Sequence, residues 1–87
     1  MKPNILSVTF EINAQSHKDG QFTVPNDVCI ILGLDNEDMI RLVVETPGGT
    51  HLFSGEKKLS SGHEIYGPEI NNFVKAGQRI RVHASRL

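Results

Sequence analysis

Apolar and polar residues alternate in two stretches of the chain, at residues 7–13 (SVTFEIN) and 79–85 (RIRVHAS). A period of two is typical of a β-strand with one buried face. The apolar face of the first stretch carries Val8, Phe10 and Ile12, and that of the second carries Ile80, Val82 and Ala84. The other face of the second stretch carries Arg79, Arg81 and His83. Both stretches are therefore predicted to be half-buried strands.

Four further strands are predicted between these two. They cover residues 21–24, 39–46, 50–55 and 63–67. An Asp-Gly pair at 19–20 precedes the first of them, and Pro-Gly-Gly at 47–49 predicts a hairpin turn between the second and the third.

Two short helices are predicted, each next to a proline. Pro25 ends the strand at 21–24, Asn26 and Asp27 are good N-cap residues, and VCIILG then predicts one or two turns of buried helix that end at Gly33. The second helix is predicted over PEINNFV, residues 68–74, with proline in its first turn and its apolar residues at helical spacing. Ala76-Gly77 follows it.

The two halves of the chain share one order of features. Each contains a strand, a proline near a helix start, a short apolar helix, a turn that contains glycine, and a second strand. Ile40-Arg41-Leu42 aligns on Ile80-Arg81-Val82 in this comparison. The pattern predicts one domain over residues 1–87, mostly β, in which halves at about 7–55 and 56–87 form an internal pseudo-twofold repeat and close a small β-barrel.

The composition is that of a small globular domain of 87 residues, with 38% apolar and 22% charged residues. One cysteine, Cys29, excludes an internal disulfide and is predicted to be a small core residue. The sequence has no spacing of cysteine or histidine that suggests zinc, and no apolar run long enough to predict a signal peptide or a membrane span. We expect a cytoplasmic protein with no cofactor and no membrane partner.

Charge is unevenly distributed along the chain. Residues 1–51 hold three basic and seven acidic residues, a net charge of −4, whereas residues 52–87 hold six basic and three acidic residues, a net charge of +3. Such asymmetry indicates an anionic partner for the second half, a contact between subunits, or ordinary solvated faces.

Residues 8–55 resemble the AbrB-like, MazE-type swapped-hairpin family. The matching marks are Asp-Gly at 19–20, FTVP at 22–25, Leu-Gly at 32–33, and Asp38 before the strand MIRLVVE. The resemblance implies a swapped-hairpin or double-psi-like barrel and a DNA-binding homodimer. A second, looser resemblance is to the pseudobarrel domains attached to restriction enzymes.

Two departures from the family pattern bear on function. The basic residue that the family carries after the turn glycine is Gln21, and helix positions that are arginines in DNA-binding members fall at Cys29 and Ile30. Loss of these arginines weakens phosphate contacts, which supply most of the affinity of DNA-binding proteins. The second half is also an extension relative to the family pattern. Shorter family members complete their barrel only as dimers, and this extension could complete it within one chain.

If the chain binds double-stranded DNA, its contacts must lie elsewhere. The candidates are Lys18, Lys57, Lys58, Lys75, Arg79, Arg81 and Arg86. The alternative interpretation of Arg79 and Arg81 is an exposed sheet face on which charge prevents edge aggregation.

Other constellations give weaker signals. The histidines have no metal-ligand spacing; they are His17, His51, His63 and His83. Ser60, Ser61 and His63 lie close in LSSGHE, but this is a typical serine-rich turn, and no enzyme activity is expected.

Our first functional hypothesis is a DNA-binding transcriptional regulator or antitoxin-like homodimer that contacts phosphates through the second half. The alternative is a protein-interaction or assembly module that keeps the barrel without binding DNA. Catalysis by a double-psi-type barrel is a third and more remote hypothesis.

Overall fold

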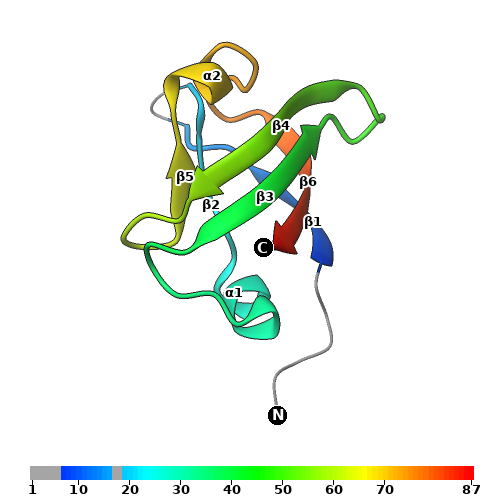
Figure 1. Ribbon diagram of the computed structural model, residues 1–87. Coiled ribbons are helices and arrows are strands. Elements are labelled where there is room, and N and C mark those ends of the chain that lie inside the picture. Colours follow the sequence, from blue (N-terminus) through cyan, green and yellow to red (C-terminus); the bar gives the residue numbers. More distant parts are fainter. Residues whose placement is uncertain (1–6, 17–18) are drawn as a thin grey trace.

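The computed structural model describes residues 7–16 and 19–87, which form a small, mostly β domain (Figure 1). Six strands and two short helices occur in these residues. In chain order they are β1 (Ser7–Asn13), β2 (Gln21–Thr23), α1 (Asn26–Leu32), β3 (Met39–Glu45), β4 (His51–Lys58), β5 (Glu64–Tyr66), α2 (Pro68–Asn71) and β6 (Arg79–Arg86). All six predicted strands are present. Strand β4 is longer than predicted and crosses the expected boundary between the halves at residues 55 and 56.

The strands form a four-stranded antiparallel sheet in the order β1-β6-β3-β4 and a two-stranded antiparallel ribbon of β2 and β5. Strands β6 and β3 lie at the centre of the sheet, where Val82 pairs with Val44. Strands β1 and β4 are its outer strands. A register shift between Val44 and Glu45 marks an irregularity in the pairing of β3 with β4.

One face of the sheet builds the core. In β6 the side chains of Ile80, Val82 and Ala84 are fully buried, as the alternating pattern predicts. Their neighbours on β3 are equally buried, and the two-stranded ribbon adds Phe22 and Ile65. Cys29 is also buried, as predicted. With only five aromatic residues in the chain, the core consists mainly of Ile, Leu and Val.

Helix α1 differs from its prediction at its start and on one face. Pro25 occupies the N-cap position, so Asn26 and Asp27 lie inside the first turn and do not cap the helix. Gly33 ends the helix in the left-handed conformation at φ 68°, as predicted. The helix was predicted to be buried, but Ile30 and Ile31 are exposed.

Helix α2 is a single turn and ends at Asn71, three residues before the predicted end. Ile70 and Val74 are buried as expected, whereas Phe73 is half exposed. The chain beyond the helix is held by the Asp19-Gly20 turn. The N–H of Gly20 donates to the carbonyl of Val74 at 2.8 Å.

No helix in the described part of the chain has the length and apolar character needed to cross a membrane.

Candidate functional site

The outer face of the four-stranded sheet carries a network of charged side chains. Arg81 on β6 lies between Glu11 on β1 and Glu45 on β3, with N–O distances of 3.1 and 3.5 Å. His83 follows Arg81 on the same face, and its Nε2 lies 2.9 Å from Glu45 Oε1. Its Nδ1 lies 2.8 Å from the hydroxyl oxygen of Thr9. The predicted shared face of Arg79, Arg81 and His83 is therefore present, but the carboxylates of Glu11 and Glu45 lie among these side chains.

The network favours the ionised form of Glu45. Its hydrogen bond with His83, together with contacts from Arg81, lowers the pKa of this carboxyl below the usual value of a glutamate. The negative charge that results offsets the positive charge of Arg81 and leaves less of it for an external anion.

Most other cations of the predicted DNA-binding set also face carboxylates or the protein itself. Lys57 forms an ion pair with Glu69, and Lys58 lies 3.4 Å from Glu37. Arg79 Nε lies 3.8 Å from a Glu11 oxygen.

The remaining members of the set lie apart from these. Arg86 points toward the end of α1 and donates to the carbonyl of Leu32 at 3.4 Å. Lys75 is exposed in the loop after α2, and Lys18 lies outside the described residues. The structure thus brings Arg79 and Arg81 together but does not gather the seven predicted residues into one surface.

A second feature, which the sequence analysis missed, is a set of exposed apolar side chains on α1, at the first residue of β3 and at the last residue of the chain. They are Ile30 at 70%, Leu87 at 56%, Met39 at 42% and Ile31 at 39%. We call these four residues the α1 patch. Arg86 lies close to several of these residues along the chain: it donates to the carbonyl of Leu32 in α1, pairs with Ile40 next to Met39, and precedes Leu87. The six-residue run VCIILG was the available signal, since a two-turn helix cannot bury every side of such a run.

The helix geometry explains which residues are exposed. Val28, Cys29 and Leu32 face the core, which leaves Ile30 and Ile31 on the outer side. Burial raises the pKa of the Cys29 thiol, and the nearby Asp27 carboxylate acts in the same direction. This cysteine is therefore a weak nucleophile.

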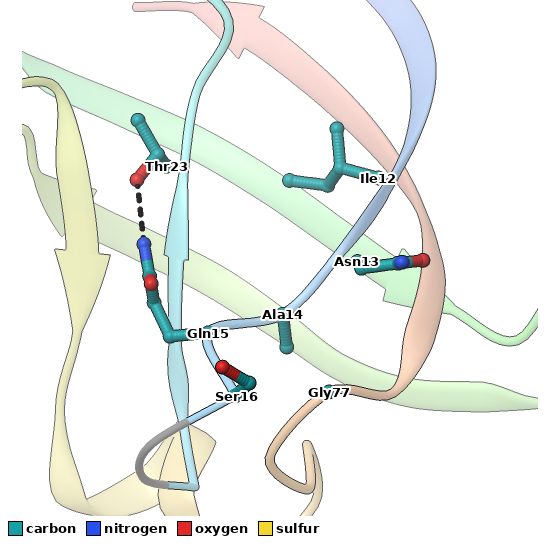
Figure 2. A pocket seen from close by; sticks show the side chains of 7 residues that line it. All are labelled: Ile12, Asn13, Ala14, Gln15, Ser16, Thr23 and Gly77. Atoms are coloured by element: carbon teal, nitrogen blue, oxygen red, sulfur yellow. Dashed lines mark hydrogen bonds between the residues drawn. The ribbon is translucent and has the colours of Figure 1, made fainter.

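A hollow of about 550 Å³ lies where β1 leaves the sheet and turns toward β2 (Figure 2). Asparagine, glutamine, serine and threonine supply its polar lining. The lining residues are Ile12, Asn13, Ala14, Gln15, Ser16, Thr23 and Gly77. Gln15 Nε2 donates to Thr23 Oγ1 at 3.0 Å across one side of the hollow, and none of the described lining side chains is charged.

Metal binding and catalysis gain no geometric support within the described residues. No three side chains of histidine, cysteine, aspartate or glutamate gather there in a way that could hold a metal ion. The hydroxyl of Ser60 donates to the carbonyl of Glu64 and so helps to close the turn before β5.

Comparison with known proteins adds information on the fold. No protein-family model and no curated protein sequence matches the chain. The chain is similar in structure to PHS018 from Pyrococcus horikoshii, whose solution structure has been determined, with a TM-score of 0.68 and 15% sequence identity. The match covers 92% of this chain and 90% of that one. At this level of identity the similarity supports a shared fold.

Proposed function

We propose that this chain is a protein assembly module that forms a homodimer through the α1 patch. The observation that carries the proposal is the exposure of Ile30 and Ile31 on the outer side of α1, with Met39 and Leu87 also exposed, in an 87-residue domain. Grouped apolar side chains on a small protein mark an interaction surface, because burying them removes apolar area from water.

The charges beside the α1 patch favour a second copy as the partner. Acidic residues Asp35, Glu37 and Asp38 lie in the turn that leads from α1 to Met39. Basic residues Lys58 and Arg86 lie next to Met39 and Ile40 through strand pairing. Lys58 lies 3.4 Å from Glu37 of the same copy, so the twofold contact that we propose exchanges this pairing between copies, as a self-complementary interface requires.

The same geometry makes this proposal stronger than DNA binding. A phosphate that approaches Arg79 or Arg81 must compete with the carboxylates of Glu11 and Glu45. The net charge of the chain is −1, and Ile30 stands where the family resemblance implies an arginine. A bare apolar helix face suits a protein partner better than a phosphate backbone.

Analytical ultracentrifugation over roughly 1 μM to 1 mM protein tests the proposal. The wild-type chain is expected to form dimers, and Ile30→Asp should weaken self-association roughly 30-fold or more because it places a charge within an apolar interface. Ser54→Asp, which adds the same charge on the exposed outer face of β4, should leave it unchanged. A wild-type monomer throughout this range, or equal association of wild type and Ile30→Asp, would overturn the proposal.

DNA binding stays the second candidate, because Arg79 and Arg81 do share one exposed sheet face. Binding of mixed-sequence duplex DNA at low and moderate salt tests it by fluorescence anisotropy. If this face binds phosphate, the double variant Arg79→Gln and Arg81→Gln should reduce the salt slope by about 2. Absence of binding at low salt would eliminate the regulator hypothesis.

We also propose that the domain is an internal pseudo-twofold repeat that closes a small barrel. In this repeat, β1, β2, α1 and β3 of the first unit correspond in order to β4, β5, α2 and β6 of the second. The strand pairings support the repeat. If each strand is replaced by its counterpart, the pair β1–β6 becomes β4–β3, and the pairs β2–β5 and β3–β6 map onto themselves, so the same pairings result.

Backbone hydrogen bonds outside the strands also correspond. The Ala14 N–H donates to Gln78, and the Leu59 N–H donates to Asp38, both at 2.8 Å. The residue before each acceptor has a positive φ angle. Glu37, before Asp38, has φ 78°, and Gly77, before Gln78, has φ 73°. A module of this kind requires no catalytic site, and a cytoplasmic location remains the expectation from the sequence.

A further inference from the structure

The hollow between β1 and β2 is bordered by two strand edges that separate from each other. The N–H of Gln15 donates to the carbonyl of Gln21 at 2.8 Å and holds the strands together at the turn. Among the described residues, no other backbone hydrogen bond joins β1 to β2. Beyond this bond the two edges diverge, and Asn13 and Thr23 line the space between them.

Backbone geometry directs hydrogen-bonding groups of both strands into this space. In an antiparallel pair, the N–H and C=O of successive residues point to alternate sides of the strand. The N–H of Ala14 is bonded to Gln78 in the direction of β6, so the backbone groups of Asn13 point the opposite way, toward β2. The N–H of Val24 is bonded to His63 in the direction of β5, so those of Thr23 point toward β1.

In the second half, the residue that matches Ile12 has a longer side chain that reaches the start of α2. Ile12 on β1 pairs with Ile80, and Lys57 on β4 pairs with Ile40, so Ile12 and Lys57 occupy matching positions. Lys57 reaches Glu69 at the start of α2 and packs so closely on Gly67 that a Cβ there would lie 2.6 Å from Lys57 Nζ. Ile12 is shorter and has no such partner, and the hollow lies beside it.

We propose that the hollow binds an extended peptide segment with small, uncharged side chains, which adds as a strand along the edge of β1 or β2. An extended backbone offers the alternating donors and acceptors that the groups of Asn13 and Thr23 require. The lining of amides, hydroxyls and Ile12 suits neutral side chains, since none of the lining residues that the structure describes could neutralise a buried charge. A volume of about 550 Å³ lies within the range of peptide and small-molecule sites. This site lies on β1 and β2 and is independent of the α1 patch.

Titration of the ¹⁵N-labelled full chain with the peptide acetyl-Ser-Val-Thr-Val-amide tests the inference by NMR. Saturable shifts are expected at the amides of Asn13, Thr23 and Gly77, with a Kd of roughly 1 mM or tighter. The same peptide N-methylated at both valines lacks two backbone donors and should bind at least about tenfold more weakly. Ser16→Trp, which fills the exposed mouth of the hollow, should weaken binding similarly, whereas Ser54→Trp on the sheet's outer face should not.

Three results would overturn strand addition. They are the absence of shifts at millimolar peptide, equal binding of the N-methylated peptide, and unchanged binding by a folded Ser16→Trp variant. Acetyl-threonine methylamide separates a peptide site from a site for small amides. If it shifts the same residues with the same Kd, the hollow binds a small neutral molecule and the strand interpretation fails.

Discussion

Helices α1 and α2 each follow a short strand, β2 and β5, and each begins at or beside a proline, yet their surroundings differ. The chain after α2 is held by the Asp19-Gly20 turn, through the bond from Gly20 to Val74 and a 2.7 Å bond from the Ala76 N–H to the Asp19 carboxylate. Helix α1 instead leaves Ile30 and Ile31 exposed. The segment after α2 is therefore fixed by the Asp19-Gly20 turn, whereas α1 leaves two isoleucine side chains exposed.

The largest expected effect is on the free energy of unfolding, and it distinguishes the buried face of α1 from its exposed face. Leu32→Ala should lower the free energy of unfolding by about 2–5 kcal/mol, because Leu32 is fully buried and truncation leaves a cavity. Ile30→Ala should change the stability of the monomer by only about 0.5 kcal/mol. Urea unfolding at low protein concentration measures both. Comparable losses would mean that Ile30 belongs to the core.

The next effect tests the contact that holds the segment around α2. Gly20→Ala should destabilise the domain by about 2–4 kcal/mol, from the strained φ of 76° and from a clash, since its Cβ would lie 2.6 Å from the backbone nitrogen of Asn71. Gly77→Ala is the matched control, because φ there is 73° but no atom lies within 4 Å. It should show the strain alone, about 1 kcal/mol. Thermal unfolding compares them, and equal losses would contradict a role for the contact with Asn71.

The smallest effect concerns acid pH and the ion pair at the start of α2. The hydrogen bond from Lys57 lowers the pKa of Glu69 in this helix. A carboxyl whose pKa is depressed on folding contributes stability above its unfolded pKa of about 4.3, and this contribution is lost as pH falls through the folded value. Amide signals at the start of α2 should therefore change as pH falls below about 4. Glu69→Gln should remove this change; if the change persists in that variant, another group is responsible.

The sequence was sufficient for most of the β-structure. The alternating stretches at 7–13 and 79–85 became β1 and β6 with the predicted faces, because a period of two leaves little choice of which side is buried. The helices were less predictable. Apolar residues in α1 exceed the width of one helix face, and the sequence does not say which of them are exposed.

The surroundings of the candidate site residues could not be predicted, because they depend on strand register. Arg81 contacts Glu11 and Glu45, which are 70 and 36 residues away in the chain. Only the pairing of β6 with both β1 and β3 brings these three side chains together. The basic residues were recognisable in the sequence, but their neutralisation by carboxylates was not.

The pairing of β1 with β6 has a consequence for biosynthesis. The first strand, β1, forms its backbone hydrogen bonds with the last strand, β6. Phe10 can therefore pair with Val82 only after β6 has been synthesised. While the chain emerges from the ribosome, the apolar side of β1 has no sheet to join until β6 has been made. Long-range closure of this kind slows folding and leaves a strand open to wrong partners in the meantime. A domain this short therefore completes its sheet only after nearly all of it has been synthesised.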